Sequence, residues 1–133
     1  MKIEIQCKTA HLYRHEDGYV VFDQHTGATQ DAKTATEMVD AARELVPEDE
    51  LAAALVLSNQ SRTTREARHI LSDYGREHLA CVALVIESRI SEITGNFFLR
   101  VNRPNYPMQL FRDVAEARKW VAGFVGTKRP PQT

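Results

Sequence analysis

The sequence predicts an α/β fold: a single mixed, mostly parallel sheet with an N-terminal antiparallel hairpin and four helices. Three observations carry this prediction. Two short continuous apolar runs, Leu51–Leu57 and Ala80–Ile86, have the length and composition of strands covered on both faces. Segments of helical periodicity alternate with these runs, which favours parallel strands joined by right-handed crossovers. Finally, Asp17-Gly18 between two apolar segments is a strong hairpin signal.

The chain is expected to begin with three strands. Residues 3–7 alternate apolar and polar side chains, which predicts a first strand with one buried face. The hairpin then pairs Leu12–His15 with Tyr19–Phe22. These strands form the antiparallel edge of the sheet.

Two helices precede the second apolar run. The first covers Ala35–Val46, and Thr29 is its candidate N-cap. The second begins at a capping box made by Thr63 and Glu66, and we expect Gly75 to end it.

A third helix is predicted between Ser88, a suitable N-cap, and Pro104, which stops it. Its apolar stripe contains Ile90, Ile93, Phe97 and Val101. Gly95 inside this helix suggests close approach to a neighbour. We therefore expect Gly95→Val to destabilise the protein by about 1–3 kcal/mol.

The last elements are a short strand, Met108–Phe111, and a helix that Asp113 caps and Gly126 ends. We expect one domain over residues 1–126 and a disordered tail over residues 127–133.

Composition restricts the partners. The 133 residues carry a net charge of −1, and the tail pair Lys128-Arg129 is the longest basic run that stands out, so nucleic-acid binding is not expected. No apolar stretch approaches a membrane span and no signal-peptide core is visible, so we expect a cytoplasmic protein without membrane contact. Cys7 and Cys81 fall at apolar strand positions, which predicts buried free thiols.

The chain resembles the STAS fold of the SpoIIAA-like anti-sigma-factor antagonists, and within it a set of small uncharacterised bacterial proteins. The resemblance covers roughly residues 10–124 and rests on Arg65–Arg68, Ala83–Ser88, Gly95–Leu99, Asn102–Pro104, Tyr106-Pro107, Leu110-Phe111, Glu116-Ala117 and Trp120. It implies a regulatory or protein-binding role, with no cofactor and no known reaction. A fold does not by itself carry a function.

One departure from that family concerns its phosphorylation switch. Phosphorylatable STAS antagonists carry an Asp-Xaa-Ser element after the strand that here ends near Leu57. This chain has Ser58–Ser61, Ser-Asn-Gln-Ser, without an aspartate. Kinase switching at this loop is therefore in doubt.

The same loop is nevertheless the candidate functional edge. It follows a parallel strand and leads into a helix N-terminus, where open α/β sheets place ligands and free N–H groups attract anions. Its candidate partner- or anion-binding residues are Ser58, Ser61, Arg62, Arg65 and Arg68. An ordinary solvated helix face is the alternative. A second candidate surface contains Asn96, Phe98 and Tyr106.

Catalytic and metal chemistry have weaker signals. His11, His15 and His25 lie near Asp23, but their spacing matches no metal motif, and hairpin histidines are usually surface residues. Cys81 lies in mid-strand, where apolar surroundings disfavour a thiolate. We therefore expect neither a metal site nor an enzyme.

Two functional hypotheses follow. The first is a non-catalytic regulatory or protein-interaction domain with an unidentified protein partner. The second is a carrier or sensor of an anionic or lipid-like small molecule held between helices and sheet. A large closed apolar pocket would favour the carrier, and a flat apolar patch the interaction domain. We also expect self-association as a homodimer, because Phe97, Phe98 and Tyr106 offer surplus apolar surface.

Overall fold

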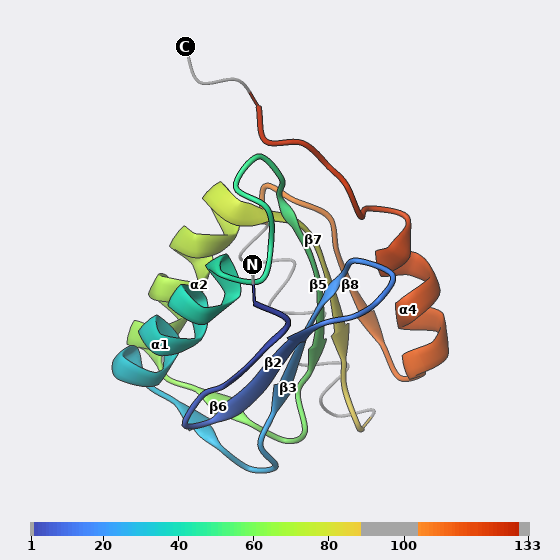
Figure 1. Ribbon diagram of the computed structural model, residues 1–133. Helices are drawn as coiled ribbons and strands as arrows, with labels where there is room; N and C mark the ends of the chain where they lie inside the picture. Colours follow the sequence, from blue (N-terminus) through green and yellow to red (C-terminus); the bar gives the residue numbers. More distant parts are fainter. Residues whose placement is uncertain (1, 89–103, 131–133) are drawn as a thin grey trace.

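A computed structural model describes residues 2–88 and 104–130, which form a sheet with helices on both faces (Figure 1). The main sheet has six strands in the order β1-β2-β3-β5-β7-β8. Their bounds are β1 Glu4–Gln6, β2 Ala10–Arg14, β3 Val20–Gln24, β5 Ala52–Leu57, β7 Leu79–Val85 and β8 Met108–Phe111. A separate two-stranded sheet pairs β4 (Thr29–Gln30) with β6 (Arg62–Thr63).

The sheet is mixed and mostly parallel in its second half, which confirms the predicted class. Strands β1, β2 and β3 pair antiparallel, whereas the β3–β5, β5–β7 and β7–β8 pairs are parallel. The two apolar runs of the sequence are neighbours, with Ala54 opposite Val82 and Leu57 opposite Val85. Both are covered on two faces, which explains why neither alternates apolar with polar residues.

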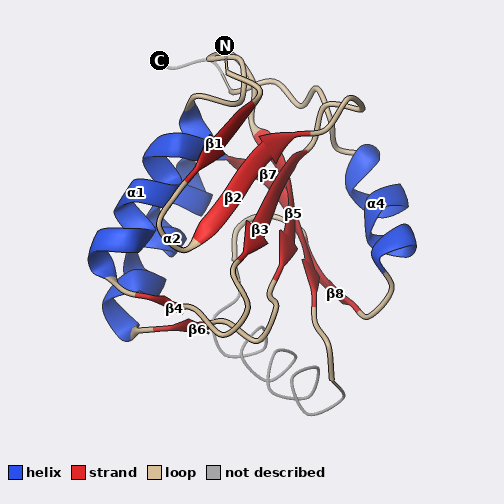
Figure 2. Cartoon of the chain, turned by 60° about the horizontal axis from the view of Figure 1, so that its bottom comes forward, coloured by secondary structure: helices blue, strands red, loops and turns tan. Residues whose placement is uncertain are grey.

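Helices α1 (Ala32–Arg43) and α2 (Arg65–His78) cover one face of the sheet, and α4 (Val114–Ala122) covers the other (Figure 2). Two core clusters result. The first packs α1 and α2 on the sheet, around Leu12, Phe22 and Leu45. The second packs α4 around Leu55 and Val121.

The described residues contain three helices rather than the four expected. The predicted third helix, with Gly95 and the proposed Gly95→Val effect, lies outside the described residues. The cap of α1 also differs from the prediction. The Asp31 carboxylate accepts a hydrogen bond from the Thr34 N–H, and the Thr34 hydroxyl accepts one from the Asp31 N–H, while Thr29 belongs to β4.

The ends of α2 and α4 differ from the prediction as well. Thr64, not Thr63, caps α2, because its hydroxyl accepts from the Ala67 N–H at 3.2 Å. Helix α2 runs past Gly75 to His78, so Gly75 lies inside the helix and does not end it. Helix α4 ends at Ala122, one turn before Gly126.

The C-terminal segment is attached to the domain through Thr127–Arg129, in contrast to the disordered tail expected from residue 127. The Leu51 N–H donates to the Thr127 carbonyl at 2.8 Å, and Lys128 forms an antiparallel bridge with Glu50. The Arg129 N–H donates to the Asp49 carbonyl at 2.8 Å. These bonds place the segment against the turn that precedes β5.

Candidate functional site

The Ser58–Ser61 turn follows β5 and holds two consecutive residues in left-handed backbone conformation. Asn59 has φ 47° and Gln60 has φ 61°. Asparagine tolerates this region, whereas glutamine adopts it at a cost of about 1–3 kcal/mol. The turn is closed by the Ser61 N–H, which donates to the Ser58 carbonyl at 2.8 Å. Its shape is therefore imposed by the surrounding contacts.

Asn59 supplies most of those contacts. Its side-chain amide donates to the Asp23 carboxylate at 2.8 Å and to the Gln24 carbonyl at 2.6 Å. Its carbonyl accepts from the Gly27 N–H at 2.9 Å. Asn59 thus ties the loop after β5 to the end of β3 through its side chain and to the turn beyond it through its carbonyl.

Ser58 is engaged by a carboxylate. Its hydroxyl donates to Glu87 Oε1 at 2.9 Å and to Oε2 at 3.2 Å. The loop itself has no aspartate, but two acids lie beside it: Asp23 at the end of β3 and Glu87 just after β7. A phosphate on Ser58 would meet the Glu87 charge directly, which disfavours modification there.

Ser61 differs from Ser58. Among the described residues its hydroxyl has no hydrogen-bond partner, and no carboxylate contacts it. Acceptance of a phosphate at Ser61 stays a prediction, and the electrostatic objection that applies to Ser58 does not apply to it.

The small β4–β6 sheet supports the basic side of this edge. The Arg62 N–H donates to the Ala28 carbonyl at 2.8 Å, and the Thr64 N–H donates to Gln30 at 2.9 Å. Gln30 is fully buried, and its side chain bonds Thr9 at 2.9 Å and Gln24 at 3.3 Å. The start of α2 is therefore fixed to the sheet by a satisfied polar network.

Three arginines project from this support. Arg62, Arg65 and Arg68 are exposed, and Arg65 and Arg68 stand three residues apart on α2, which places them on one face. Arg68 donates to the Thr63 carbonyl at 2.9 Å. In the described part of the chain, none of the three is paired with a carboxylate. The structure thus brings the predicted residues to one edge.

The second predicted surface is only partly described, because Asn96 and Phe98 lie outside the described residues. Tyr106 is half-buried and packs on the first core cluster next to Gly75. Burial raises the pKa of its hydroxyl. Tyr106 is therefore a packing residue as much as a surface residue.

The histidines of the hairpin have separate partners. His11 Nε2 lies 3.0 Å from a Glu4 carboxylate oxygen, and His15 accepts from the Asp17 N–H at 3.0 Å and stacks on Tyr19. Within residues 2–88 and 104–130, no group of three His, Cys, Asp or Glu side chains is arranged to hold a metal ion.

Both cysteines are buried and free, as predicted. Burial raises the pKa of Cys81 to about 12, and burial followed by the Glu37 charge raises that of Cys7. A thiol that stays protonated at neutral pH is a poor nucleophile, which fits a packing role for both residues.

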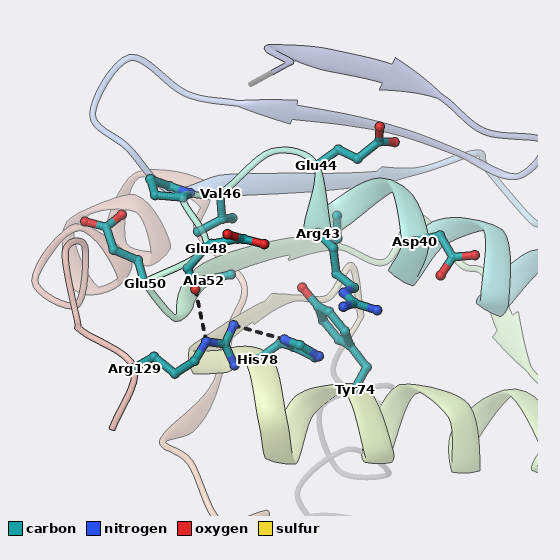
Figure 3. A pocket seen from close by; sticks show the side chains of 12 residues that line it. Asp40, Arg43, Glu44, Val46, Glu48, Glu50, Ala52, Tyr74, His78 and Arg129 are labelled. Carbon is teal, nitrogen blue, oxygen red and sulfur yellow. Dashed lines mark hydrogen bonds between the residues drawn. The ribbon is translucent and has the colours of Figure 1, made fainter. Parts of the chain in front are cut away.

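A cavity that was not predicted from the sequence lies at the C-terminal ends of α1 and α2, away from the arginine edge. It is open, has a volume of about 730 Å³, and is framed by Arg43, Glu48, Tyr74, His78 and Arg129 (Figure 3). No sequence pattern marks it, because its residues come from two helices, a turn and a segment that looked like a free tail.

The floor of this cavity has unusual electrostatics. Burial raises the pKa of the Tyr74 hydroxyl, while burial and the nearby Arg129 and Arg43 guanidinium groups lower the pKa of His78. The Tyr74 and His78 rings stack with centroids 5.1 Å apart. Arg43 has no carboxylate partner among the described residues. The two guanidinium groups therefore lie beside the stacked rings, while the carboxylates of Asp40, Glu44, Glu48 and Glu50 also line the cavity.

Comparison with solved structures places the fold. A crystal structure of an uncharacterized protein of the DUF3478 family with a SpoIIAA-like fold, from Shewanella loihica PV-4, superposes with a TM-score of 0.65 at 13% identity. The match covers 91% of this chain and 98% of that one. At this identity the likeness shows the fold alone, and the fold is SpoIIAA-like.

Comparison with domain families gives a narrower assignment. Residues 13–125 match a domain of unknown function, DUF7793, and the chain belongs to that family. No curated protein sequence matches it. Among the described residues, no helix is long and apolar enough to cross a membrane.

Proposed function

We propose that this protein is a non-catalytic regulatory domain that binds a protein partner through the edge formed by Ser58–Ser61 and the start of α2. One observation carries the proposal: a turn held in left-handed geometry leads into β6 and α2, where Arg62, Arg65 and Arg68 are exposed and without carboxylate partners among the described residues. Guanidinium groups suit the carboxylates of a partner, because their planar fork can donate two parallel hydrogen bonds to one carboxylate. The partner surface is expected to be acidic.

The chemistry of this edge supports a binding role over a catalytic one. The two carboxylates next to the turn, Asp23 and Glu87, are already hydrogen-bonded to Asn59 and Ser58, and a third acid, Glu66, lies exposed in the first turn of α2. A serine activated for attack would need a base such as histidine in hydrogen-bond reach, and Ser58 has a carboxylate instead. We therefore propose that the domain is not an enzyme.

The proposal is tested by affinity capture from native cells with three tagged proteins. Wild type is compared with Arg62→Ala/Arg65→Ala and with a charge-matched control, Arg112→Ala/Arg118→Ala, whose exposed arginines lie at the start of α4 and on it. A partner recovered by wild type and control, but lost by the first double variant, supports the edge. Equal recovery by all three proteins overturns it.

A second candidate function is the binding of a small anion in the open cavity. The specific observation in its favour is the pair Arg43 and Arg129, which face the cavity beside the Tyr74 hydroxyl (Figure 3). Two rim acids are already near lysines: Glu44 lies 3.5 Å from Lys2. Glu50 lies 3.7 Å from Lys128. The lining is mixed and open, which suits a carboxylate or phosphate better than a lipid chain.

This candidate has its own test. Calorimetric titration with inorganic phosphate and, separately, with citrate should show saturable binding that Arg43→Gln weakens and Arg118→Gln, an exposed arginine of α4, leaves unchanged. Binding that ignores Arg43, or no binding at millimolar concentration, excludes the cavity as an anion site.

Homodimer formation remains part of the proposal and is independent of both sites. The dimer was predicted from the apolar surface of Phe97, Phe98 and Tyr106, and Tyr106 is half-buried within the protomer. Light scattering at high micromolar concentration decides it, since a molar mass equal to that of one chain removes the dimer.

A further inference from the structure

Besides the backbone bonds of Thr127–Arg129, the C-terminal segment is held to the domain by one side chain that makes three separate hydrogen bonds. Arg129 Nε donates to the Glu48 carbonyl at 3.2 Å, Nη1 donates to the Glu77 carbonyl at 2.7 Å, and Nη2 lies 3.1 Å from His78 Nδ1. The three acceptors belong to the turn before β5 and to the last turn of α2, and Figure 3 draws the bonds to Glu48 and His78. Arg129 thus joins two elements that the chain itself does not connect at this point.

The bond to His78 fixes the protonation state of that ring. A guanidinium group only donates, so Nδ1 of His78 must be the acceptor. The ring is then neutral, with its proton on Nε2, which lies 3.7 Å from a Glu77 carboxylate oxygen. A second proton on the ring would occupy Nδ1, remove the acceptor, and place a positive charge against the guanidinium.

We propose that His78 and Arg129 form a proton-operated latch. While His78 is neutral, Thr127–Arg129 stays on the turn before β5, and when His78 gains a proton the segment detaches more readily and the cavity loses one wall. The latch is a regulatory device distinct from the proposed partner-binding edge, which lies at the other end of α2.

The charges around His78 favour this direction. Arg129 faces it from the C-terminal segment and Arg43 from α1, whereas Glu77 on its own helix is the acid that faces it, with the Tyr74 ring stacked below. Burial is the largest cause of its lowered pKa, followed by Arg129 and Arg43, and Glu77 opposes them only weakly. Glu48 and Glu50 at the cavity rim come from the turn that Arg129 joins.

The sign of the pH dependence follows. Detachment removes the Arg129 guanidinium, one of the groups that hold the His78 pKa below the ordinary histidine value of about 6.5, so the attached state binds the proton less readily than the detached state. Attachment is therefore complete above that value and weakens as pH falls below it. One proton allows a loss of at most about tenfold in the attachment equilibrium per pH unit.

Hydrogen exchange measured by NMR tests the latch on the full chain. The reporter is the Arg129 backbone amide, which donates to the Asp49 carbonyl. Its protection, corrected for the intrinsic pH dependence of exchange, should be constant from pH 8 to 7 and fall by up to about tenfold per unit toward pH 5. Amides of β7 at the sheet centre should keep their protection over the same range.

Two variants separate the latch from general acid sensitivity. His78→Gln offers an amide oxygen that accepts without titrating, so its Arg129 protection should not fall, whereas His69→Gln, which changes an exposed histidine of α2, should behave as wild type. A flat wild-type profile, or the same fall in His78→Gln, overturns the proposal. In Arg129→Gln, the His78 pKa read from ring NMR shifts should rise, and an unchanged pKa also overturns it.

Discussion

The hydroxyl of Tyr106 lies against the backbone of Gly75, so closely that an added Cβ atom would stand 2.7 Å from its oxygen. Alanine favours a helix interior over glycine by about 1 kcal/mol, whereas overpacking costs about 1–3 kcal/mol. The steric term is the larger, so Gly75→Ala should lower the free energy of unfolding by up to about 2 kcal/mol. Urea denaturation measures this difference.

The same contact predicts a reversal of sign. In a Tyr106→Ala background the space next to Gly75 is open, and Gly75→Ala should then stabilise by up to about 1 kcal/mol through helix propensity alone. If Gly75→Ala has the same effect in both backgrounds, the two residues are not in contact.

A buried hydroxyl gives a second prediction. Tyr19 is 1% exposed, and its hydroxyl has no hydrogen-bond partner in the part of the chain that the structure describes. Such a group costs about 1–3 kcal/mol, so Tyr19→Phe should raise the free energy of unfolding by about 1 kcal/mol. Tyr13→Phe, at a half-buried ring on the same hairpin, should change it by less than about 0.5 kcal/mol. Destabilisation by Tyr19→Phe would mean that the hydroxyl is satisfied.

A third prediction concerns the Ser58–Ser61 turn of the candidate edge. Gln60 has φ 61°, a conformation that glycine adopts without steric cost. We expect Gln60→Gly to be neutral or to stabilise by up to about 1 kcal/mol, since relief of strain outweighs or balances the added entropy of the unfolded chain. Asn59→Ala loses two side-chain hydrogen bonds and should destabilise by about 1–3 kcal/mol. Thermal melts that rank the two variants in the opposite order contradict this description of the turn.

A fourth prediction separates the two serines. Ser58→Asp places a carboxylate beside Glu87 and should destabilise by about 0.5–1 kcal/mol at low salt, with the loss reduced at 0.5 M salt. Ser61→Asp faces no such acid and should leave the melting midpoint nearly unchanged. Equal losses would show that the Ser58–Glu87 contact does not decide where a negative charge is tolerated.

The fold was largely predictable because its signals are local and regular. Leu51–Leu57 and Ala80–Ile86 identify buried strands by composition alone, and Asp17-Gly18 identifies the hairpin. The role of Gly75 was predicted wrongly. It was expected to end a helix, yet it lies inside α2, where Tyr106, thirty-one positions later, packs on it. A contact at that sequence separation leaves no local pattern.

The candidate site was also predictable only where its signals are local in the sequence. Chain order alone places Ser58, Arg62 and Arg65 at one edge, since a loop after a parallel strand must lie there. The acids that accompany the loop, Asp23 in β3 and Glu87 just after β7, could not be assigned from sequence. The Arg129–His78 contact was equally hidden, because a short polar terminus reads as a free tail unless its partners are known.

The central claim is that the arginine edge binds a protein partner, and the dissociation constant of the purified partner tests it most directly. Each charge-assisted hydrogen bond is worth about 1.5–3 kcal/mol, so Arg62→Ala/Arg65→Ala should weaken binding by at least about tenfold with an unchanged melting midpoint. The control Arg112→Ala/Arg118→Ala should bind as wild type does. An unchanged dissociation constant for the Arg62/Arg65 variant would contradict the account.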